Sequence, residues 1–255
     1  MSFKGFDLAG KVAVLTGSTS GMGLAIARGL AQCDARIVVS NNVQSETEDA
    51  ARLLVNEGYE VKGACCDITS ASDIERFAGV SKSAFGRVDI VICLAAGPVP
   101  VGPIAEVDIP LFERLLITTV SNNLLLVRQF LPEMAERRDG SIIMMSSIAS
   151  QRANQHIGAY GAAKAAMNGV VRSIAAEWGA FNIRANALAP SIVRTNFSKP
   201  LVGDPDREKI FAAKSPANRI AEPEDIVGAA ILLASPAGAY ISGQTILIDG
   251  GRSII

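Results

Sequence analysis

Seven short runs of apolar, mainly β-branched residues recur along the chain, and segments with helical spacing separate them. Most of these runs are continuously apolar rather than alternating, which is typical of strands that helices cover on both faces. The pattern predicts an α/β fold with a doubly wound, seven-stranded parallel sheet and helices on both faces. The expected strands are Val12–Leu15, Arg36–Val39, Glu60–Cys65, Ile90–Leu94, Ile142–Met145, Arg184–Leu188 and Thr245–Ile248.

No repeat, low-complexity tract or linker divides the chain, so residues 1–255 are expected to form a single dinucleotide-binding Rossmann domain. Residues 196–218 follow the sixth strand and contain several prolines. Ligands bind at the carboxyl ends of the strands in such sheets, so we expect these residues to form a substrate lid. The expected helices are Met22–Gln32, Ser45–Asn56, Ala71–Ala84, Pro110–Arg138, His156–Gly179 and Glu224–Ala234.

The charge balance argues against several classes of partner. The chain has 24 Lys and Arg against 25 Asp and Glu, which leaves no basic excess for a nucleic acid backbone. Prolines interrupt the apolar stretches before they reach the roughly 20 residues of a transmembrane helix, so no membrane contact is expected. The first residues show no apolar leader, which favours the cytoplasm. Four cysteines without C-x-x-C spacing and one histidine predict no metal site.

A glycine-rich segment joins the first strand to the first helix, with the sequence Thr16-Gly17-Ser18-Thr19-Ser20-Gly21-Met22-Gly23. Glycines at such a turn let backbone N–H groups and the positive end of the helix approach a pyrophosphate. We therefore predict that the residues from Gly17 to Gly23 bind a dinucleotide. A glycine-rich turn with a structural role alone is the alternative.

Ser147, Tyr160 and Lys164 suggest acid–base chemistry. Residues four apart on a helix share a face, so the Lys164 ammonium can act on the Tyr160 phenol and favour its ionised form. A hydroxyl at the end of the fifth strand, that of Ser147, can donate to the same substrate oxygen. A Tyr-x-x-x-Lys pair also occurs on many helix surfaces, so its meaning here depends on the serine and the glycine turn beside it.

Together these motifs make the chain resemble the short-chain dehydrogenase/reductase family over nearly its whole length. The glycine turn matches the family's T-G-x-x-x-G-x-G motif, and the family's serine, thirteen residues before the tyrosine, selects Ser147. The resemblance implies an NAD(P)-dependent oxidoreductase that interconverts a secondary alcohol and a ketone by hydride transfer. It also implies that Tyr160 is the general acid or base, that Lys164 lowers its pKa and holds the nicotinamide ribose, and that Ser147 orients the substrate.

The resemblance implies further contacts with the cofactor. Asp67 looks like the acid that contacts the adenine amine, and Thr195 looks like the threonine that binds the carboxamide. Ile192 and Val193 are expected to present backbone to the nicotinamide. The remaining positions that the resemblance assigns to the cofactor are Ile68, Ala95, Ala96, Gly97 and Pro190, together with Tyr160 and Lys164.

Three departures from the family pattern stand out. Leu94-Ala95-Ala96-Gly97 replaces Asn-Asn-Ala-Gly, and Pro190-Ser191 replaces Pro-Gly. Thr119 stands where the family has the helix asparagine that helps to hold a water behind the lysine. We expect the Thr119 hydroxyl to serve part of this proton relay, so that the relay is altered rather than absent.

The choice of cofactor depends on Asn41 and Asn42, which follow the second strand. An acid at this point bonds to the ribose 2′-OH of NAD, whereas an arginine accommodates the 2′-phosphate of NADP. The two asparagines leave both cofactors open. The absence of a neighbouring cation in the sequence favours NAD.

A small-molecule substrate is expected to contact Ser147, Tyr160 and His156, although an exposed histidine at the start of a helix is the alternative for His156. Reduction of a 3-oxoacyl thioester is a second candidate function, and the basic residues near the mouth that would suit it are Arg194, Lys199, Arg207 and Lys209. A cofactor-binding regulatory protein with little turnover is a third. The family's usual assembly implies a homotetramer built on the two longest helices and the C-terminal strand.

Overall fold

The computed structural model describes residues 4–95 and 97–255; Ala96, a predicted cofactor residue, lies outside the described residues. One parallel sheet has the strand order β3-β2-β1-β4-β5-β6-β7, which confirms the predicted doubly wound topology. The strands are β1 (Val12–Thr16), β2 (Arg36–Val39), β3 (Val61–Gly63), β4 (Ile90–Cys93), β5 (Gly140–Met145), β6 (Ile183–Pro190) and β7 (Thr245–Ile248).

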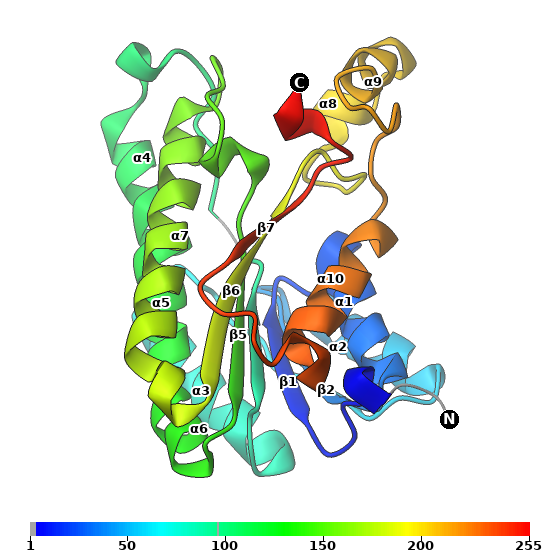
Figure 1. Ribbon diagram of the computed structural model, residues 1–255, viewed down its shortest axis with the longest axis vertical. Coiled ribbons are helices and arrows are strands. Elements are labelled where there is room, and N and C mark those ends of the chain that lie inside the picture. Colours follow the sequence, from blue (N-terminus) through cyan, green and yellow to red (C-terminus); the bar gives the residue numbers. More distant parts are fainter. Residues whose placement is uncertain (1–3, 96) are drawn as a thin grey trace.

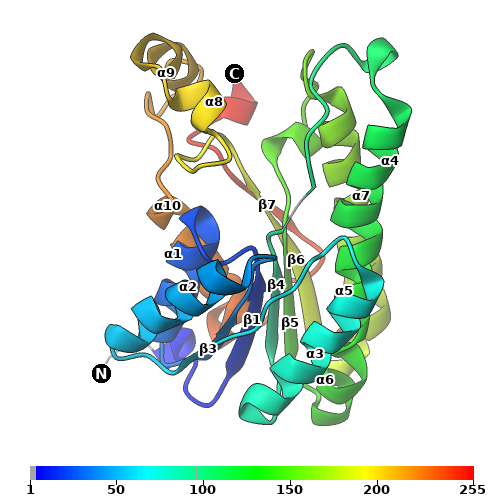
Figure 2. The ribbon, with the colours of Figure 1, turned by 180° about the vertical axis from the view of Figure 1, so that it is seen from behind.

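Helices cover both faces of the sheet (Figure 1). α1, α2 and α10 lie on one face and α3, α5 and α7 on the other, and Figure 2 shows the same two layers from behind. The helices are α1 (Gly21–Gln32), α2 (Gln44–Asn56), α3 (Ala71–Phe85), α4 (Ile109–Leu116), α5 (Asn122–Arg128), α6 (Leu131–Arg137), α7 (Gly158–Trp178), α8 (Lys199–Val202), α9 (Pro205–Ala212) and α10 (Glu224–Ala234).

The side chains of each central strand contribute to two hydrophobic cores, one on each face of the sheet. Successive side chains of a strand point to opposite faces, so Val14 packs in the same core as Phe77 of α3, while Leu15 packs in the same core as Ile26 of α1. All residues of β1, β4 and β5 are buried. This double coverage explains why the strands are continuously apolar in sequence.

The segment expected to form one helix, Pro110–Arg138, is divided in the structure. α4 passes into a π-helical turn at Ile117–Ser121, after which α5 continues. α6 starts separately, because Pro132 has no N–H with which to continue the hydrogen bonds of α5. π-helical turns often accompany functional sites, and this one carries Thr119.

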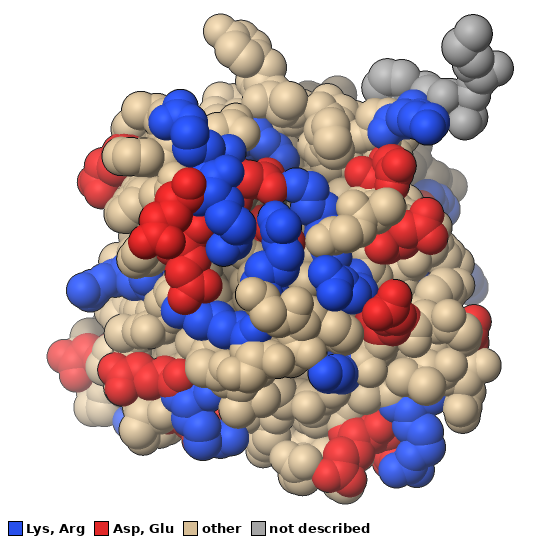
Figure 3. All heavy atoms as spheres, turned by 90° about the horizontal axis from the view of Figure 1, so that it is seen from below, with Lys and Arg blue, Asp and Glu red and all other residues tan. Residues whose placement is uncertain are grey.

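The face at the amino ends of the strands carries Lys and Arg side chains interleaved with Asp and Glu (Figure 3). The buried Asp89 carboxylate accepts the backbone N–H of Val12 at 2.9 Å and pairs with the Arg87 guanidinium at 2.5 Å. Lys11 pairs with Asp139. These interactions tie the starts of β1, β4 and β5 together at the end of the sheet away from the predicted site.

Residues 196–218, the predicted lid, contain α8 and α9 and lie beyond the carboxyl ends of the strands (Figure 1). Asp204 caps α9 by accepting the backbone N–H groups of Asp206 at 3.1 Å and Arg207 at 2.9 Å. Within residues 4–95 and 97–255, none of the helices has both the length and the apolar character needed to cross a membrane.

Candidate active site

The glycine turn follows β1 and leads directly into α1. Gly17 and Gly21 have positive φ angles of 62° and 51°, which a residue with a side chain rarely adopts. A Cβ atom on Gly23 would lie 2.1 Å from the backbone oxygen of Gly17. The turn therefore needs glycine at these positions, and it leaves its backbone free of side-chain cover at the N-terminus of α1, where an anion binds well.

Ser18 and Thr19 join the glycine turn to the end of β2. The Ser18 hydroxyl donates to the Leu15 carbonyl and accepts the Ser40 backbone N–H, each at 2.9 Å. The Asn41 side-chain amide donates to the Thr19 hydroxyl at 2.9 Å. The Ser18 side chain thus serves the fold itself, whereas Thr19 and Asn41 form a polar surface beside the turn.

Glu46 is a residue of this region that the sequence analysis missed. It lies in the first turn of α2, five residues after Asn41, and its carboxylate accepts a hydrogen bond from the Asn41 amide. A carboxylate therefore lies beside the end of β2 although neither Asn41 nor Asn42 is acidic. Its exposed position one element further along gave no signal in the sequence.

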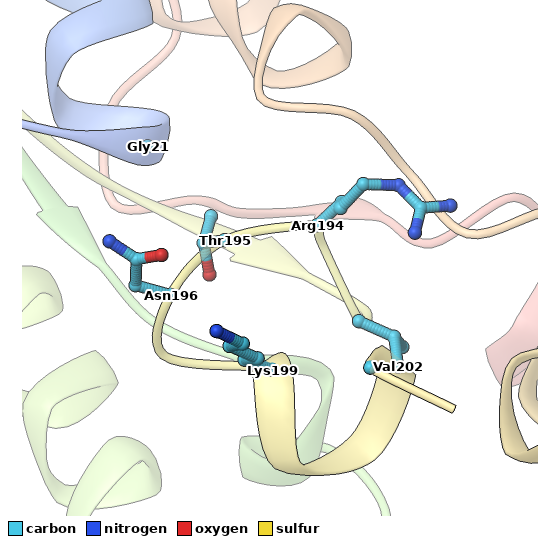
Figure 4. A pocket seen from close by; sticks show the side chains of 7 residues that line it. Gly21, Arg194, Thr195, Asn196, Lys199 and Val202 are labelled. Carbon is cyan, nitrogen blue, oxygen red and sulfur yellow. The ribbon is translucent and has the colours of Figure 1, made fainter. Parts of the chain in front are cut away.

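A hollow of about 400 Å³ opens between the glycine turn and the predicted lid (Figure 4). Thr195 lies close against the turn, since a Cβ atom on Gly21 would lie 2.9 Å from its Cγ2 atom. A dinucleotide pyrophosphate fits this arrangement, because Gly21 contributes backbone and no side chain to the wall of the hollow. The lining residues are Gly21, Arg194, Thr195, Asn196, Lys199, Val202 and Gly203.

Arg194 forms ion pairs with two carboxylates. Its guanidinium donates two hydrogen bonds to Glu208 of α9, at 2.6 and 2.8 Å, and one to Glu222 at 2.9 Å. Lys199 has no ion pair among the described residues, and its side chain is directed toward Asn196 (Figure 4). Among the basic residues predicted near the mouth, the Arg194 charge is therefore compensated, whereas, in the part of the chain that the structure describes, the Lys199 charge is not.

Lys164 is buried, with 3% of its surface exposed. Its ammonium donates to the backbone oxygen of Met145, at the end of β5, at 2.6 Å, and lies 5.6 Å from the centroid of the Tyr160 ring. Burial lowers the pKa of Lys164 to about 8. The predicted pair therefore shares one face of α7, beside the carboxyl end of the central sheet.

Tyr160 and Ser147 are also brought together. The Ser147 side chain hydrogen-bonds to the Tyr160 phenol and lowers its pKa, but burial has the larger effect and raises the pKa of Tyr160 to about 12. The phenol is therefore protonated at neutral pH and can give a proton to an oxygen held between it and Ser147.

Ser150 and Asn168 support this group, and the sequence analysis missed both. Ser150 donates its hydroxyl to the Ser147 backbone oxygen at 2.7 Å, and Asn168 donates its side-chain amide to the Ser150 hydroxyl at 2.9 Å. Asn168 follows Lys164 by four residues on α7, so the same helical spacing that pairs Tyr160 with Lys164 could have identified it.

The remaining predicted residues lie around this centre at the carboxyl ends of the strands. Asp67 accepts two hydrogen bonds from Thr69, from the backbone N–H at 2.9 Å and the hydroxyl at 2.8 Å. The backbone oxygen of Ile68 accepts the Asn122 amide at 2.6 Å. His156 is exposed, and its backbone oxygen accepts the Gly102 N–H at 2.8 Å, which joins the loops after β4 and before α7.

No group of three or more His, Cys, Asp or Glu residues suited to a metal ion occurs in the part of the chain that the structure describes. Burial raises the pKa of the Cys66 and Cys93 thiols to about 12. These thiols stay protonated at neutral pH, so neither is a ready nucleophile.

Comparison with known proteins identifies the family. A family model described as "Enoyl-(Acyl carrier protein) reductase" matches residues 17–253. "Dehydrogenase/reductase SDR family member 4" of Bos taurus is 38% identical over 241 residues, covering 94% of this chain and 86% of that protein. The chain belongs to the short-chain dehydrogenase/reductase (SDR) family. The Homo sapiens protein of the same name is 36% identical, over 96% of this chain and 88% of its own length.

Solved structures of SDR proteins share the whole fold. The gluconate 5-dehydrogenase of Burkholderia cenocepacia, solved with NADP and tartrate, superposes with a TM-score of 0.93 at 29% identity, covering 99% of this chain and 98% of that one. A short-chain type dehydrogenase/reductase of Mycobacterium ulcerans superposes with a TM-score of 0.92 at 27% identity, over 97% and 91% of the two chains. The predicted family and the predicted fold are thus both confirmed.

The departures from the SDR pattern are accommodated locally. The Thr16 hydroxyl accepts the backbone N–H groups of Leu94 at 3.2 Å and Ala95 at 3.3 Å, which ties β1 to the end of β4 where the family has two asparagines. Thr119 is buried in the π-helical turn and its hydroxyl has no hydrogen-bond partner among the described residues. The backbone oxygen of Thr119 accepts a hydrogen bond from the Asn123 side-chain amide at 2.9 Å.

Proposed function

We propose that this SDR protein is an NAD(P)-dependent oxidoreductase that interconverts a secondary alcohol and a ketone, with Tyr160 as general acid and base. The observation that carries the proposal is the convergence of Ser147, Tyr160 and Lys164 at the carboxyl end of β5. The hydrogen bond between the Ser147 and Tyr160 side chains and the buried ammonium beside the phenol support it.

The cofactor would lie along the carboxyl ends of the strands. The residues from Gly17 to Gly23 would bind its pyrophosphate, Asn41 and Asn42 its adenine ribose, and Asp67 and Ile68 its adenine. Pro190, Ile192, Val193 and Thr195 would hold the nicotinamide, together with Ala95 and Gly97. When bound, the reduced nicotinamide supplies the hydride that adds to the carbonyl carbon.

The side chains of this protein supply the proton and the orientation. The Ser147 hydroxyl and the Tyr160 phenol together hold the substrate oxygen, which aligns the carbonyl before reaction. The Tyr160 phenol gives its proton to this oxygen as the alcohol forms, and the phenolate that results is stabilised by the Lys164 ammonium nearby. In alcohol oxidation the same proton moves in the opposite direction. Thr119 is proposed to take part in the resupply of this proton behind Lys164.

We infer that NAD is the preferred cofactor. The Glu46 carboxylate beside Asn41 favours a ribose hydroxyl, which can donate a hydrogen bond, over a negatively charged phosphate. The NADP-bound gluconate 5-dehydrogenase shows that a close structural relative takes NADP, so the preference is a matter of degree.

Reduction of a 3-oxoacyl thioester is the second candidate. The matching family model is described as an enoyl reductase, which acts on a C=C bond, so it supports the acyl-carrier thioester and not the 3-oxo group. The pairing of Arg194 with Glu208 and Glu222 weakens this candidate, since that guanidinium is already neutralised. A regulatory role with little turnover is weakened by the presence of all three side chains of the proposed acid–base group.

We further propose a cytoplasmic homotetramer. Apolar side chains are exposed on α4 and its π-helical extension, where Ile109 and Ile117 have 56% and 50% of their surface accessible, and at the C-terminus, where Ile254 is 82% accessible. Exposed apolar surface of this kind favours contacts between subunits. The mass of the protein in solution, measured by light scattering, tests the assembly.

The activity is tested by incubating the protein with NADH or NADPH and a panel of ketones while the absorbance of the reduced cofactor is followed. Tyr160→Phe is expected to bind the cofactor as the wild type does and to lose turnover by at least about a hundredfold. Tyr240→Phe is the matched control, because Tyr240 is fully exposed. Full activity in Tyr160→Phe would contradict the mechanism, and cofactor binding without turnover on any ketone would favour the regulatory alternative.

A further inference from the structure

Two arginines that are a hundred residues apart in sequence are in contact beyond the carboxyl ends of the strands (Figure 1). Arg152 lies on the loop between Ser147 and α7, and Arg252 begins the turn that follows β7 (Arg252–Ile254). The Arg152 guanidinium donates to the backbone oxygen of Arg252 at 2.8 Å. This contact fixes the C-terminal turn to the loop that also carries Ser147.

The Arg252 side chain is half-buried between β6 and the lid. Its guanidinium donates to the hydroxyl of Ser191 at 3.4 Å, and Ser191 directly follows Pro190 at the end of β6. Its Cζ atom lies 5.9 Å from the centroid of the Phe211 ring on α9. In both ribbon views the C-terminal turn lies next to α8, beyond the carboxyl ends of the strands (Figures 1 and 2).

Neither arginine forms an ion pair with a described residue. Within residues 4–95 and 97–255, no carboxylate lies within ion-pair distance of either guanidinium, in contrast with Arg194 and its two glutamates. The nearest acid in sequence, Asp249, is engaged by the backbone N–H groups of Gly251 at 2.9 Å and Ser253 at 2.7 Å.

Further positive charge surrounds the same point. The Lys214 ammonium lies 4.8 Å from the centroid of the Phe211 ring, on which Arg252 also packs. Burial lowers the pKa of Arg252 and the charge of Arg152 lowers it further, while the charge of Asp249 acts in the opposite direction. A half-buried cation beside another cation is costly, and an anion that binds between them offsets this cost.

We propose that Arg252, with Arg152 beside it, binds an anionic group of the substrate, so that the enzyme acts on oxo acids or phosphorylated ketones and on the corresponding hydroxy compounds. The inference rests on the proposed function and names its substrate class. Ser191, where the family has glycine, positions Arg252 through its hydroxyl. The anionic group is held at the mouth and takes no part in the redox step.

The test compares matched pairs of substrates. Acetoacetate and acetylacetone have nearly the same shape and differ in charge, as do dihydroxyacetone phosphate and dihydroxyacetone in their phosphate group. We expect the wild type to prefer the charged member of at least one pair. Arg252→Met is expected to raise the KM for that member by about 10- to 100-fold, the range for loss of a charge-assisted hydrogen bond, and to leave the neutral member unchanged. Arg252→Lys should restore part of the loss.

Two controls show whether an effect of Arg252→Met is specific to the proposed anion site. Arg128→Met removes an exposed arginine without an ion pair among the described residues, at the far end of α5, and should leave all four KM values unchanged. NADH affinity, measured by fluorescence, should be equal in Arg252→Met and the wild type, because the proposed site contacts the substrate and not the cofactor.

The two substrate pairs distinguish a carboxylate site from a phosphate site, and either result supports the inference. Equal turnover of charged and neutral members, or equal loss on both in Arg252→Met, would overturn it. If no ketone is turned over, the proposed function fails, and calorimetry with malonate then decides on the site separately. Malonate binding that is weaker in Arg252→Met than in the wild type supports the anion site, and indistinguishable binding overturns it.

Discussion

The side-chain amide of Asn41, at the carboxyl end of β2, donates a hydrogen bond to the carboxylate of Glu46 on α2. The same amide donates to the hydroxyl of Thr19 in the glycine turn. An acid is thereby held beside the position proposed for the adenine ribose, although neither asparagine of the Asn41-Asn42 pair is acidic. This relationship gives the most direct test of cofactor choice.

Glu46→Gln is expected to improve the use of NADPH. The glutamine keeps the size of the side chain and removes the charge that would repel a 2′-phosphate. Because the carboxylate is exposed and therefore screened, we expect kcat/KM for NADPH to rise by about three- to tenfold at low salt, and by less at high salt. Glu48→Gln, on the same helix, is the control. Unchanged NADPH kinetics in Glu46→Gln would show that the ribose lies elsewhere.

Gly23→Ala is expected to abolish cofactor binding. The new Cβ atom would lie 2.1 Å from the Gly17 oxygen, so the turn that is proposed to hold the pyrophosphate must shift. We expect NADH affinity to fall by more than about a hundredfold and the free energy of unfolding to fall by about 1–3 kcal/mol, as for other overpacked sites.

Gly79→Ala is the matched control for this substitution. Gly79 lies in α3 with no atom within 4 Å of an added Cβ atom. Alanine favours a helix over glycine by about 1 kcal/mol, so this variant should be slightly more stable than the wild type and bind NADH equally well. If Gly23→Ala also binds NADH with wild-type affinity in fluorescence titration, the glycine turn does not hold the cofactor.

Lys164→Met is expected to lose activity and gain stability. Burial of the Lys164 ammonium disfavours its charged form, which lowers its pKa from 10.5 to about 8. At pH 7 the wild type therefore folds with a costly buried charge, which methionine removes. Loss of the hydrogen bond to Met145 offsets part of the gain, so the free energy of unfolding should rise by about 1–3 kcal/mol.

The stability difference between Lys164→Met and the wild type is expected to depend on pH. Between about pH 8 and pH 10.5 the unfolded wild type still binds a proton at Lys164 while the folded protein does not, so wild-type stability rises with pH through this range. Urea unfolding should show the advantage of Lys164→Met in full at pH 7 and much reduced at pH 10. Lys209→Met, at an exposed position, should show no such change. An equal advantage at both pH values would mean that Lys164 is not desolvated.

The periodicity of the sequence was enough to predict the sheet, because strands covered on both faces need continuous apolar runs. The acid–base group was predictable for a similar reason: Tyr160 and Lys164 lie one helical turn apart, and the family pattern selects Ser147. The division of Pro110–Arg138 was not predictable in the same way. Its π-helical turn packs against α7, and local spacing carries no signal of this tertiary contact.

Side-chain contacts between different elements were also not predictable from the sequence. Glu46 reaches Asn41 from the next helix, and Arg152 meets Arg252 across a hundred residues. Nothing in the local pattern marks these residues, since exposed Glu and Arg are common on any helix or loop. Charge type could be read from the sequence, but which charges remain without a partner became clear only in three dimensions.

Glu208→Gln is expected to loosen the lid without unfolding the protein. Arg194, at the edge of the hollow beside the glycine turn, holds α9 through two hydrogen bonds to Glu208, and both side chains are partly exposed. Exposed ion pairs contribute little to global stability, so the melting temperature should stay within about 2 °C, while the KM for the cofactor should rise by up to about fivefold. Asp206→Asn removes a more exposed charge from the same helix and should change neither quantity. A lower melting temperature with unchanged KM would mean that the Arg194–Glu208 pair supports the fold and does not control access to the site.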